Sequence, residues 1–342
     1  MRLIGRGKRE KGMRQRGLGG AALALALLSA AAPSAAQAPG AKSAVISQAC
    51  QRECLIGFLR RYMIALATHK PSAAPFARDA MFTENDVAIP LGQGLWRNIS
   101  RIAPDGLEAA DQETKQAAWF GVVWENGAPA YLGLRIHVTD DGRIDEVETV
   151  VHRKDGMPAP FGDPEAVKHD AAFQEVLPPE LRRPRQRLQA IADSYFNTVE
   201  QNDGQVFAPF SDDCGRLENG ISTTAGAVKV QGQVGNAAAI AQGCEAQFKL
   251  GIYRINKRVR ARRYPLIDEE RGIVVATGFF DHANSFDNYK LTNGQTMKTA
   301  LKWPNSITLL EAFRVKDGKI QRIEAIFTYV PYFMPNPWEN RR

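Results

Sequence analysis

The 342-residue sequence lacks the short motifs with which many enzymes hold a nucleotide or activate a nucleophile. It has no Gly-rich phosphate loop, no dinucleotide-binding glycine pattern, no Gly-x-Ser-x-Gly elbow and no His-Glu-x-x-His motif. Its cysteines also lack the Cys-x-x-Cys spacing that is typical of a zinc knuckle. These absences leave carboxyl, imidazole and phenol groups as carriers of any chemistry, so we expect neither a metal nor an organic cofactor.

Excess positive charge is confined to the N-terminal residues. Residues 1–36 hold seven of the 44 Lys and Arg residues and one of the 37 Asp and Glu residues, which leaves 37 basic and 36 acidic side chains. Because the remaining chain is nearly neutral, it has no overall basic surface for phosphate backbones. Nucleic acid is therefore not an expected partner.

The first 36 residues have the pattern of a secretory signal peptide. Basic residues precede an apolar run at 21–32, and small residues follow at 34–38. The run of about 12 apolar residues is shorter than the roughly 20 needed to cross a bilayer, which favours cleavage over an uncleaved anchor. Cleavage after Ala36 or at the Ala-x-Ala pattern ending at Ala38 predicts a periplasmic or secreted chain without stable membrane insertion.

An internal repeat organises the rest of the chain. Residues 74–85 return as residues 208–219, with six of twelve positions identical, including Glu84 and Asn85 against Glu218 and Asn219. An Asp-Gly turn followed by strand-like sequence occurs at 141–148 and again at 317–324. Upstream of each copy lies a helical apolar stripe with a central tyrosine. The first stripe contains Leu55, Phe58, Leu59, Tyr62 and Leu66, and the second contains Leu188, Ile191, Ala192, Tyr195 and Val199.

The repeat predicts two domains of α+β class, each with helices packed on a curved antiparallel sheet. The first domain is expected at 45–153 and the second at 185–335, joined by a proline-rich linker at 154–184. The segment 282–306 has no counterpart in the first domain, as is common for a lid or binding loop. Expected first-domain elements are a helix at 45–69, a helical turn at 75–79, an extended segment at 82–90, a short helix ending near 102, and strands at 115–125, 128–139 and 143–153. Expected second-domain elements are helices at 185–202 and 245–253, and strands at 258–267, 273–281, 307–316 and 319–329.

The four cysteines, Cys50, Cys54, Cys214 and Cys244, are expected to form disulfides, because an exported chain meets an oxidising compartment. Three connectivities are open. Pairing Cys50 with Cys54 and Cys214 with Cys244 fits the repeat best, since each bridge then stays within one half.

The order of elements resembles the nuclear transport factor 2-like superfamily, also called SnoaL-like or cone-fold. A closer similarity is to an uncharacterised family with two such domains in tandem. It rests on the following motifs: Phe82-Thr83-Glu84-Asn85, Leu91-Gly92-Gln93-Gly94-Leu95-Trp96, Arg216-Leu217-Glu218-Asn219-Gly220, Phe279-Phe280-Asp281-His282, and Tyr332-Phe333-Met334 with Pro337-Trp338.

The resemblance implies an apolar pocket between helices and sheet, with catalytic side chains on its walls. Enzymes of this superfamily mostly move protons with a carboxylate or histidine of adjusted pKa. Asp281 and His282, at the end of an apolar strand, are the leading candidates, because an aspartate can orient an imidazole. The alternative is a capped strand end with a solvated histidine. Tyr195 and Tyr253 are candidate hydrogen-bond donors, although packing also explains a tyrosine on an apolar helix face.

Further residues are candidates for substrate binding. Glu218 and Asn219 recur in both halves, which a structural role also predicts. Arg260 and Arg262 share one face of an expected strand and could clamp an anionic substrate, or could simply be solvated. Trp303, in the unmatched loop, could close over an aromatic ligand, although tryptophans are more often found in cores or interfaces.

The sequence therefore predicts an exported lyase or isomerase that acts by elimination, dehydration or isomerisation on a small hydrophobic or aromatic substrate, which could be anionic. A non-catalytic ligand-binding or interaction protein of the same fold is the alternative. Converging titratable groups in the pocket would favour the enzyme, and a wholly apolar pocket would favour the carrier. The oligomeric state, including a homo-oligomer, stays open.

Overall fold

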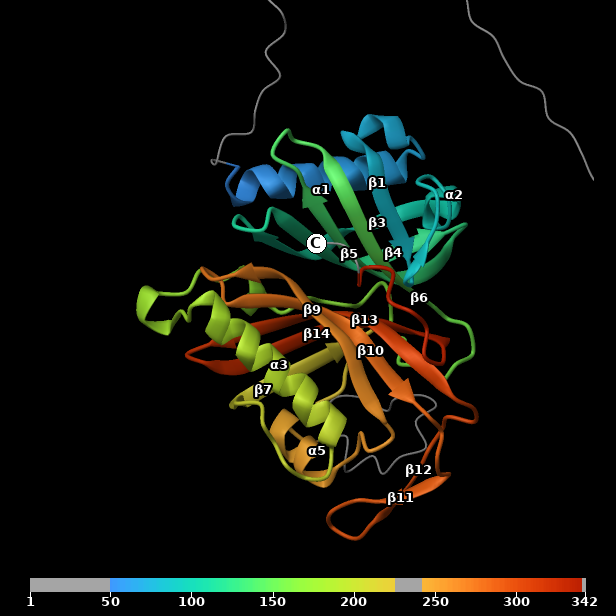
Figure 1. Cartoon of the computed structure of the whole chain (residues 1–342), viewed down its shortest axis with the longest axis vertical. Coiled ribbons are helices and arrows are strands. Elements are labelled where there is room, and N and C mark those ends of the chain that lie inside the picture. Colours follow the sequence, from blue (N-terminus) through green and yellow to red (C-terminus); the bar gives the residue numbers. More distant parts are fainter. Residues whose placement is uncertain (1–49, 225–241, 340–342) are drawn as a thin grey trace, which may run out of the picture. The chain divides into compact units, whose positions relative to one another are not determined.

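The computed structural model describes residues 50–224 and 242–339. The predicted signal segment and most of the glycine-rich stretch after residue 220 lie outside the described residues. The described chain forms two α+β halves, each with a six-stranded mixed sheet and helices packed on it (Figure 1). The fold class predicted from the sequence is confirmed.

The first half begins with one long helix and continues as an almost uninterrupted sheet. Its helices are α1 (Arg52–Ala67), the 3-10 turn η1 (Pro71–Ala73) and α2 (Leu95–Asn98), and its strands are β1 (Phe76–Glu84), β2 (Val87–Ala88), β3 (Ile99–Asp111), β4 (Gln116–Glu125), β5 (Ala128–Val138) and β6 (Ile144–Arg153).

The second half repeats this order after a connection that contains two 3-10 turns, η2 (Ala171–Gln174) and η3 (Pro179–Leu181). In the chain, a small hairpin, β11 with β12, follows β10 and precedes β13. The described helices of the second half are α3 (Arg185–Gln201) and α5 (Cys244–Leu250), and its strands are β7 (Phe210–Glu218), β8 (Ile221–Ser222), β9 (Arg258–Asp268), β10 (Ile273–His282), β11 (Asn288–Lys290), β12 (Thr296–Lys298), β13 (Asn305–Lys316) and β14 (Lys319–Pro331).

The two sheets have the same topology. The first has the order β2-β1-β6-β5-β4-β3 and the second β8-β7-β14-β13-β10-β9, which match strand for strand. In each sheet one pair is parallel, β1 with β6 and β7 with β14, and the remaining pairs are antiparallel. The parallel pair starts from Phe76 opposite Ile144 in one half and from Phe210 opposite Ile320 in the other, with a bulge after each. The repeat in the sequence is therefore a repeat of structure.

The repeated asparagines explain part of this agreement. Asn85 and Asn219 both have positive φ, 50° and 45°, in the turn after the first strand of their sheet. The Asn85 side chain donates to the carbonyl of Val151 and accepts from its amide, at 3.1 and 2.7 Å. The Asn219 side chain makes the same two bonds with Phe327, both at 3.0 Å. Each asparagine thus ties the turn to the neighbouring parallel strand, because a short amide tolerates the left-handed backbone and supplies both a donor and an acceptor.

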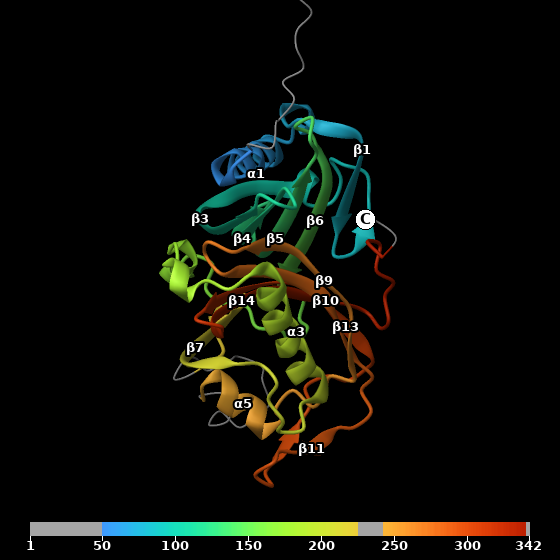
Figure 2. The ribbon, with the colours of Figure 1, turned by 60° about the vertical axis from the view of Figure 1, so that its left-hand side comes forward.

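The two apolar stripes predicted on α1 and α3 are buried. In Figures 1 and 2, α1 lies along the first sheet, whereas α3 and α5 lie against the second. Helix α1 runs from Arg52 to Ala67, with Gln51 as its N-cap, and it ends before Pro71. The first residues of the predicted helix, 45–49, lie outside the described residues. The predicted stripe residues with less than 5% exposure are Leu55, Phe58, Leu59, Tyr62, Leu66, Leu188, Ile191, Ala192, Tyr195 and Val199.

Two local predictions for the first half are wrong. The segment 75–79 is not a helical turn, because β1 starts at Phe76 and pairs with β6, a partner about 70 residues away that local sequence does not reveal. Strand β3 was not predicted, because the sequence suggested only a short helix ending near residue 102. It is an edge strand interrupted by Pro104 and Gly106, and its register shifts between Ile102 and Gly106, so its alternation is weak.

Both disulfides stay within one half, as expected from the repeat: Cys50 bonds Cys54, and Cys214 bonds Cys244. A third apolar cluster contains residues of both sheets, among them Phe120, Tyr131, Leu310 and Ile326. None of the helices in the described ranges has the length and hydropathy needed to cross a membrane.

Candidate active site

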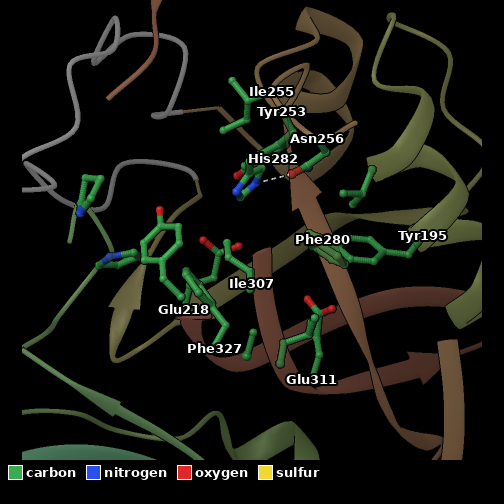
Figure 3. Close-up of a pocket in the computed structure, with 16 residues that line it drawn as sticks. Tyr195, Glu218, Tyr253, Ile255, Asn256, Phe280, His282, Ile307, Glu311 and Phe327 are labelled. Atoms are coloured by element: carbon green, nitrogen blue, oxygen red, sulfur yellow. Dashed lines mark hydrogen bonds between the residues drawn. The ribbon is translucent and has the colours of Figure 1, made fainter. Parts of the chain in front are cut away.

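A cavity of about 120 Å³ lies within the second half, between α3, the segment after α5 and the inner face of the second sheet (Figure 3). Most of its wall is apolar, including Val199, Phe280, Ile307 and Leu309. Into this apolar wall are set side chains that can exchange protons or donate hydrogen bonds: Tyr195, Glu218, Tyr253, His282, Glu311 and Tyr329.

The pKa of Glu311 is strongly perturbed. Glu311 lies on β13, where the alternation of the strand places it on the same face as Leu309 and Phe313, inside the apolar core of this half. The residue is 2% exposed, and its Oε2 atom is buried without a hydrogen-bond partner. Burial, and secondly the negative charge of Glu218, raise the pKa of Glu311 to about 8. At neutral pH this carboxyl therefore holds its proton for most of the time.

Tyr195 is the direct partner of Glu311. It lies at the centre of the buried stripe of α3, and its hydroxyl shares a hydrogen bond with the Glu311 carboxyl. Its ring packs edge-on against Phe313, at 5.0 Å between centroids, and against Phe248, at 5.5 Å. Burial raises the pKa of Tyr195 well above its ordinary value, so the phenol stays protonated and acts as a donor.

A buried ion pair forms another part of the site. Arg216 on β7 is fully buried, and its Nη2 atom lies 3.3 Å from Oε1 of Glu218. The same nitrogen donates to the Tyr253 hydroxyl. The positive charge of Arg216 opposes the rise in the pKa of Glu311, while Glu218 reinforces it. The cavity thus contains one ion-paired carboxylate and one carboxyl that burial keeps protonated.

In Figure 3, His282 and Glu311 lie on opposite sides of the set of side chains that line the cavity. The Nδ1 of His282 is 2.8 Å from Oδ1 of Asn305, and its Nε2 is 2.7 Å from Oδ1 of Asn256. Asn305 is oriented by donating from Nδ2 to the carbonyl of Trp303, so its oxygen faces the ring, and each ring nitrogen thus lies against an amide oxygen. Burial lowers the pKa of His282, so the neutral imidazole is favoured.

The structure brings together four of the residues selected from the sequence. Tyr195, Tyr253, Glu218 and His282 all contribute to the cavity wall. Their assignment to catalysis or binding stays a prediction.

Asp281 does not line this cavity. Its carboxylate is fully buried, where it accepts from Nε of Arg260 at 2.9 Å and from Oγ of Ser306 at 2.6 Å, and it lies 3.2 Å from Nε of Arg258. It points to the opposite side of β10 from its neighbour His282, as strand alternation requires. The expected pair in which Asp281 orients His282 is therefore not present, and two asparagines orient the imidazole instead.

The other sequence-based candidates also lie outside the cavity wall. Asn219 is engaged in the turn described above. Arg260 is bound by Asp281 and the carbonyl of Met334. Arg262 is held by Asn197 at 2.6 Å and by Glu200 at 2.5 Å, both on α3. The side chain of Trp303 is 58% exposed. The prediction that the two arginines share a strand face is wrong. Ala261 between them has a positive φ of 53° at a register shift, so Arg260 turns to Asp281 and Arg262 turns to α3. Protein groups occupy both, so they do not form an open clamp.

The sequence interpretation missed Glu311. A signal for it was present, because the strand from Ile307 to Phe313 is apolar except at this position and Thr308. Structural pairing shows that the corresponding residue of the first half is Leu134: Leu134 lies opposite Thr149 and Trp119, and Glu311 lies opposite Ala325 and Ala276. An ionisable group in the second half, at a position that is leucine in the first half, indicates a functional site.

The first half has no comparable set of groups at the equivalent positions. Leu134 replaces Glu311, and Phe82 replaces Arg216. Both are buried in a core that also contains Tyr62 and Trp96, whose rings meet edge-on at 5.3 Å. Glu84, the counterpart of Glu218, accepts from the amide of Leu95 at 2.7 Å and pairs with Arg153 at 2.8 Å. There the repeated glutamate is a structural link.

Comparisons with known proteins identify no activity. A family model described as a domain of unknown function (DUF8021) matches residues 181–327, which lie mainly in the second half. No curated protein matches the chain.

Several solved structures are similar to one half of the chain. A putative polyketide cyclase from Xanthomonas campestris pv. campestris has 18% identity over 42% of this chain and 92% of its own, with a TM-score of 0.27. AclR, a putative hydroxylase from Streptomyces galilaeus, has 15% identity over 43% and 83%, with a TM-score of 0.26. The Mtr2–Mex67 M domain complex of C. albicans has 14% identity over 43% and 98%, with a TM-score of 0.25. We draw no conclusion about function from these similarities.

The architecture itself is two six-stranded mixed sheets in tandem, each packed with helices. Among the described residues no group of three or more His, Cys, Asp or Glu side chains is placed to hold a metal ion.

Proposed function

We propose that the second half is an enzyme that transfers protons within a small, mainly hydrophobic substrate, in an isomerisation, a dehydration or another elimination. The observation that carries this proposal is Glu311, a fully buried carboxyl with a pKa of about 8 and an unpartnered oxygen in an apolar cavity. Leaving such a group unsatisfied costs about 1–3 kcal/mol of stability, and perturbed carboxyls of this kind are concentrated at catalytic sites.

The protonation state of Glu311 suits general acid catalysis. At pH 7 the neutral carboxyl can donate a proton to a leaving hydroxyl, or a hydrogen bond to an enolate oxygen as charge develops. Once it has lost the proton, its carboxylate is a stronger base than an ordinary glutamate and can remove a proton from carbon. Tyr195 holds the carboxyl in place and can donate to the same developing charge.

Glu218 and Tyr253 supply the second pole of the reaction. Glu218 is an ion-paired carboxylate of the same cavity, available as an acceptor for a substrate proton, and Tyr253 is fixed by Arg216. Two carboxyl groups in different protonation states allow proton removal at one substrate atom and delivery at another. His282 remains a candidate for proton transfer.

Solvent hydrogen exchange tests this proposal before the natural reaction is known. A panel of aromatic and alicyclic ketones is incubated with the protein in D2O, and NMR records deuterium entering the carbon next to the carbonyl. We expect exchange with the wild-type protein and a loss of about 10²–10⁴-fold in Glu311→Gln. Tight binding of panel members without any exchange would contradict the enzyme and support the carrier.

We also propose that the mature chain is exported. The two disulfides support this proposal, because such bonds persist in oxidising compartments. Fractionation of cells that express the full chain, with N-terminal sequencing of the product, tests it. Full-length, reduced protein in the cytoplasm would be the contrary result.

A further inference from the structure

A second pocket adjoins the cavity of Glu311 and differs from it in chemistry. It has a volume of about 260 Å³ and is formed by residues that follow α5, by the residues after β10 and by residues near the end of β12. Its polar lining includes Arg254, Lys257, Asn284, Ser285 and Thr299, and its described lining contains no aspartate or glutamate. The inner cavity is mainly apolar, whereas this outer pocket is polar and carries positive charge.

The two spaces share one wall. Ile255, Asn256 and His282 line both the inner cavity and the outer pocket. Asn256 and His282 are hydrogen-bonded to each other at 2.7 Å, and both are at least nine-tenths buried. Ile255, Asn256 and His282, here called the neck, are the only described residues common to the two linings. A ligand that occupies both spaces therefore lies against the neck.

The cations of the outer pocket are not engaged by acidic groups. Within residues 50–224 and 242–339, neither Arg254 nor Lys257 forms an ion pair, in contrast to Arg260 and Arg262 on the adjacent strand. The protein contact of the Arg254 side chain is a 3.4 Å hydrogen bond to the carbonyl of Lys290. The pocket thus offers two positive charges that no acidic side chain of the described residues neutralises.

We propose that the inner cavity and the outer pocket form one amphipathic site for a substrate with an apolar body and an anionic tail. The apolar body lies beside Glu311, the tail passes the neck, and a carboxylate or similar anion lies near Arg254 and Lys257. This inference rests on the proposed function, and it adds the class of substrate. It also gives His282 a position along the substrate, between the reacting end and the tail.

Binding of two matched probes tests the inference. The probes are 4-phenylbutyrate and its neutral analogue 4-phenylbutan-1-ol, titrated calorimetrically at pH 8 and low salt. We expect the wild-type protein to bind the carboxylate more tightly. In the double variant Arg254→Gln with Lys257→Gln, carboxylate affinity should fall about three- to tenfold and alcohol affinity should stay unchanged, as for exposed charge pairs. A control variant, Lys298→Gln with Lys319→Gln, removes the same charge elsewhere in this half and should change neither affinity.

The location of the probes is checked by filling the inner cavity. Ala325 lies opposite Glu311 and lines the cavity, so Ala325→Phe, or Ala325→Leu if phenylalanine prevents folding, should weaken both probes. Unchanged phenylbutyrate binding in the filled variant would overturn the single amphipathic site.

The outcomes separate the two proposals. If both probes bind with equal affinity, and the Arg254 and Lys257 variant changes neither, the anionic subsite is wrong while the apolar cavity of the proposed function stands. If neither probe binds the wild-type protein, both the subsite and the aromatic ligand are wrong.

Discussion

The two halves have one scaffold and two different interiors. Strand order, the parallel pair with its bulge, the turn asparagine and the central helix tyrosine are the same in both. The interior of the first half is completed by Phe82, Leu134 and Trp119, whereas the second half has Arg216, Glu311 and Ala276 at those positions. The three large apolar groups of the first half are thus replaced in the second half by a charged group, a carboxyl group and a methyl group.

This difference separates what maintains the fold from what is available for chemistry. A feature present in both halves, such as the hydrogen bonds of Asn85 and Asn219, is sufficiently explained by structure. A feature present in one half only, such as the buried carboxyl of Glu311, is unnecessary for the fold and costs stability. We infer that the first half serves as a structural partner and the second half carries the function.

Placing a carboxyl in the first half should have the largest effect on stability. Leu134→Glu puts a glutamate where Glu311 lies in the second half, but in a filled core that has Phe82 at the position of Arg216. We expect a loss of about 3–5 kcal/mol in the free energy of unfolding at pH 8, measured with urea. Leu134→Met is the control and should lose less than about 1.5 kcal/mol. A loss below 1 kcal/mol in Leu134→Glu would mean that the two interiors are equivalent.

The disulfides should contribute unequally. The bridge between Cys214 and Cys244 spans 30 residues and that between Cys50 and Cys54 spans 4. Loop-closure entropy predicts that replacing both cysteines of a pair by alanine costs about 3.5 kcal/mol for the long loop and about 2 kcal/mol for the short one. Denaturant unfolding of the two double variants measures the difference. Equal losses would contradict an effect set by loop length.

The asparagine pair should behave alike in the two halves. Asn85→Ala and Asn219→Ala each remove two partly buried hydrogen bonds and leave alanine at positive φ, so each should cost about 2 kcal/mol. Binding of phenylbutanol by the Asn219 variant should stay within about twofold of wild type, since the asparagine lies outside the cavity wall. A selective loss of binding in this variant would restore Asn219 as a ligand contact, as the sequence suggested.

Much of the fold could be predicted because its signals are local. The helical stripes, the Asn126-Gly127 hairpin and the two Asp-Gly turns each depend on a few neighbouring residues, and the structure has all of them. Strand β1 depends on a distant parallel partner, and β3 is interrupted by Pro104, so neither had a clear local pattern.

The site was only partly predictable, for a physical reason. Aligning the halves on their Asp-Gly turns does not bring Glu311 onto Leu134, because the first hairpin has one more residue between paired positions, Val138 with Ile144 against Val315 with Ile320. The environment of Glu311 is assembled from α3, β7 and β13, and sequence spacing does not reveal such a meeting. Likewise, the acidic partners of Arg262 come from α3 and could not be read from its own strand.

The titration of Glu311 tests the central claim most directly. Its pKa is about 8 in the folded state and near 4.5 when unfolded, so the folded state holds the proton more tightly. Its contribution to stability is complete below about pH 4.5 and is lost as the pH rises through about 8, with a slope of up to about 1.4 kcal/mol per pH unit. Glu311→Leu, which installs the residue of the first half, should remove this slope.

The measurement is the free energy of unfolding of wild type and Glu311→Leu, determined by urea denaturation from pH 4.5 to pH 9. We predict that the stability of the variant relative to wild type increases steadily across this range and levels off above about pH 8. Parallel curves for the two proteins would show that Glu311 titrates normally, and would contradict a buried, proton-holding carboxyl as the functional group of the second half.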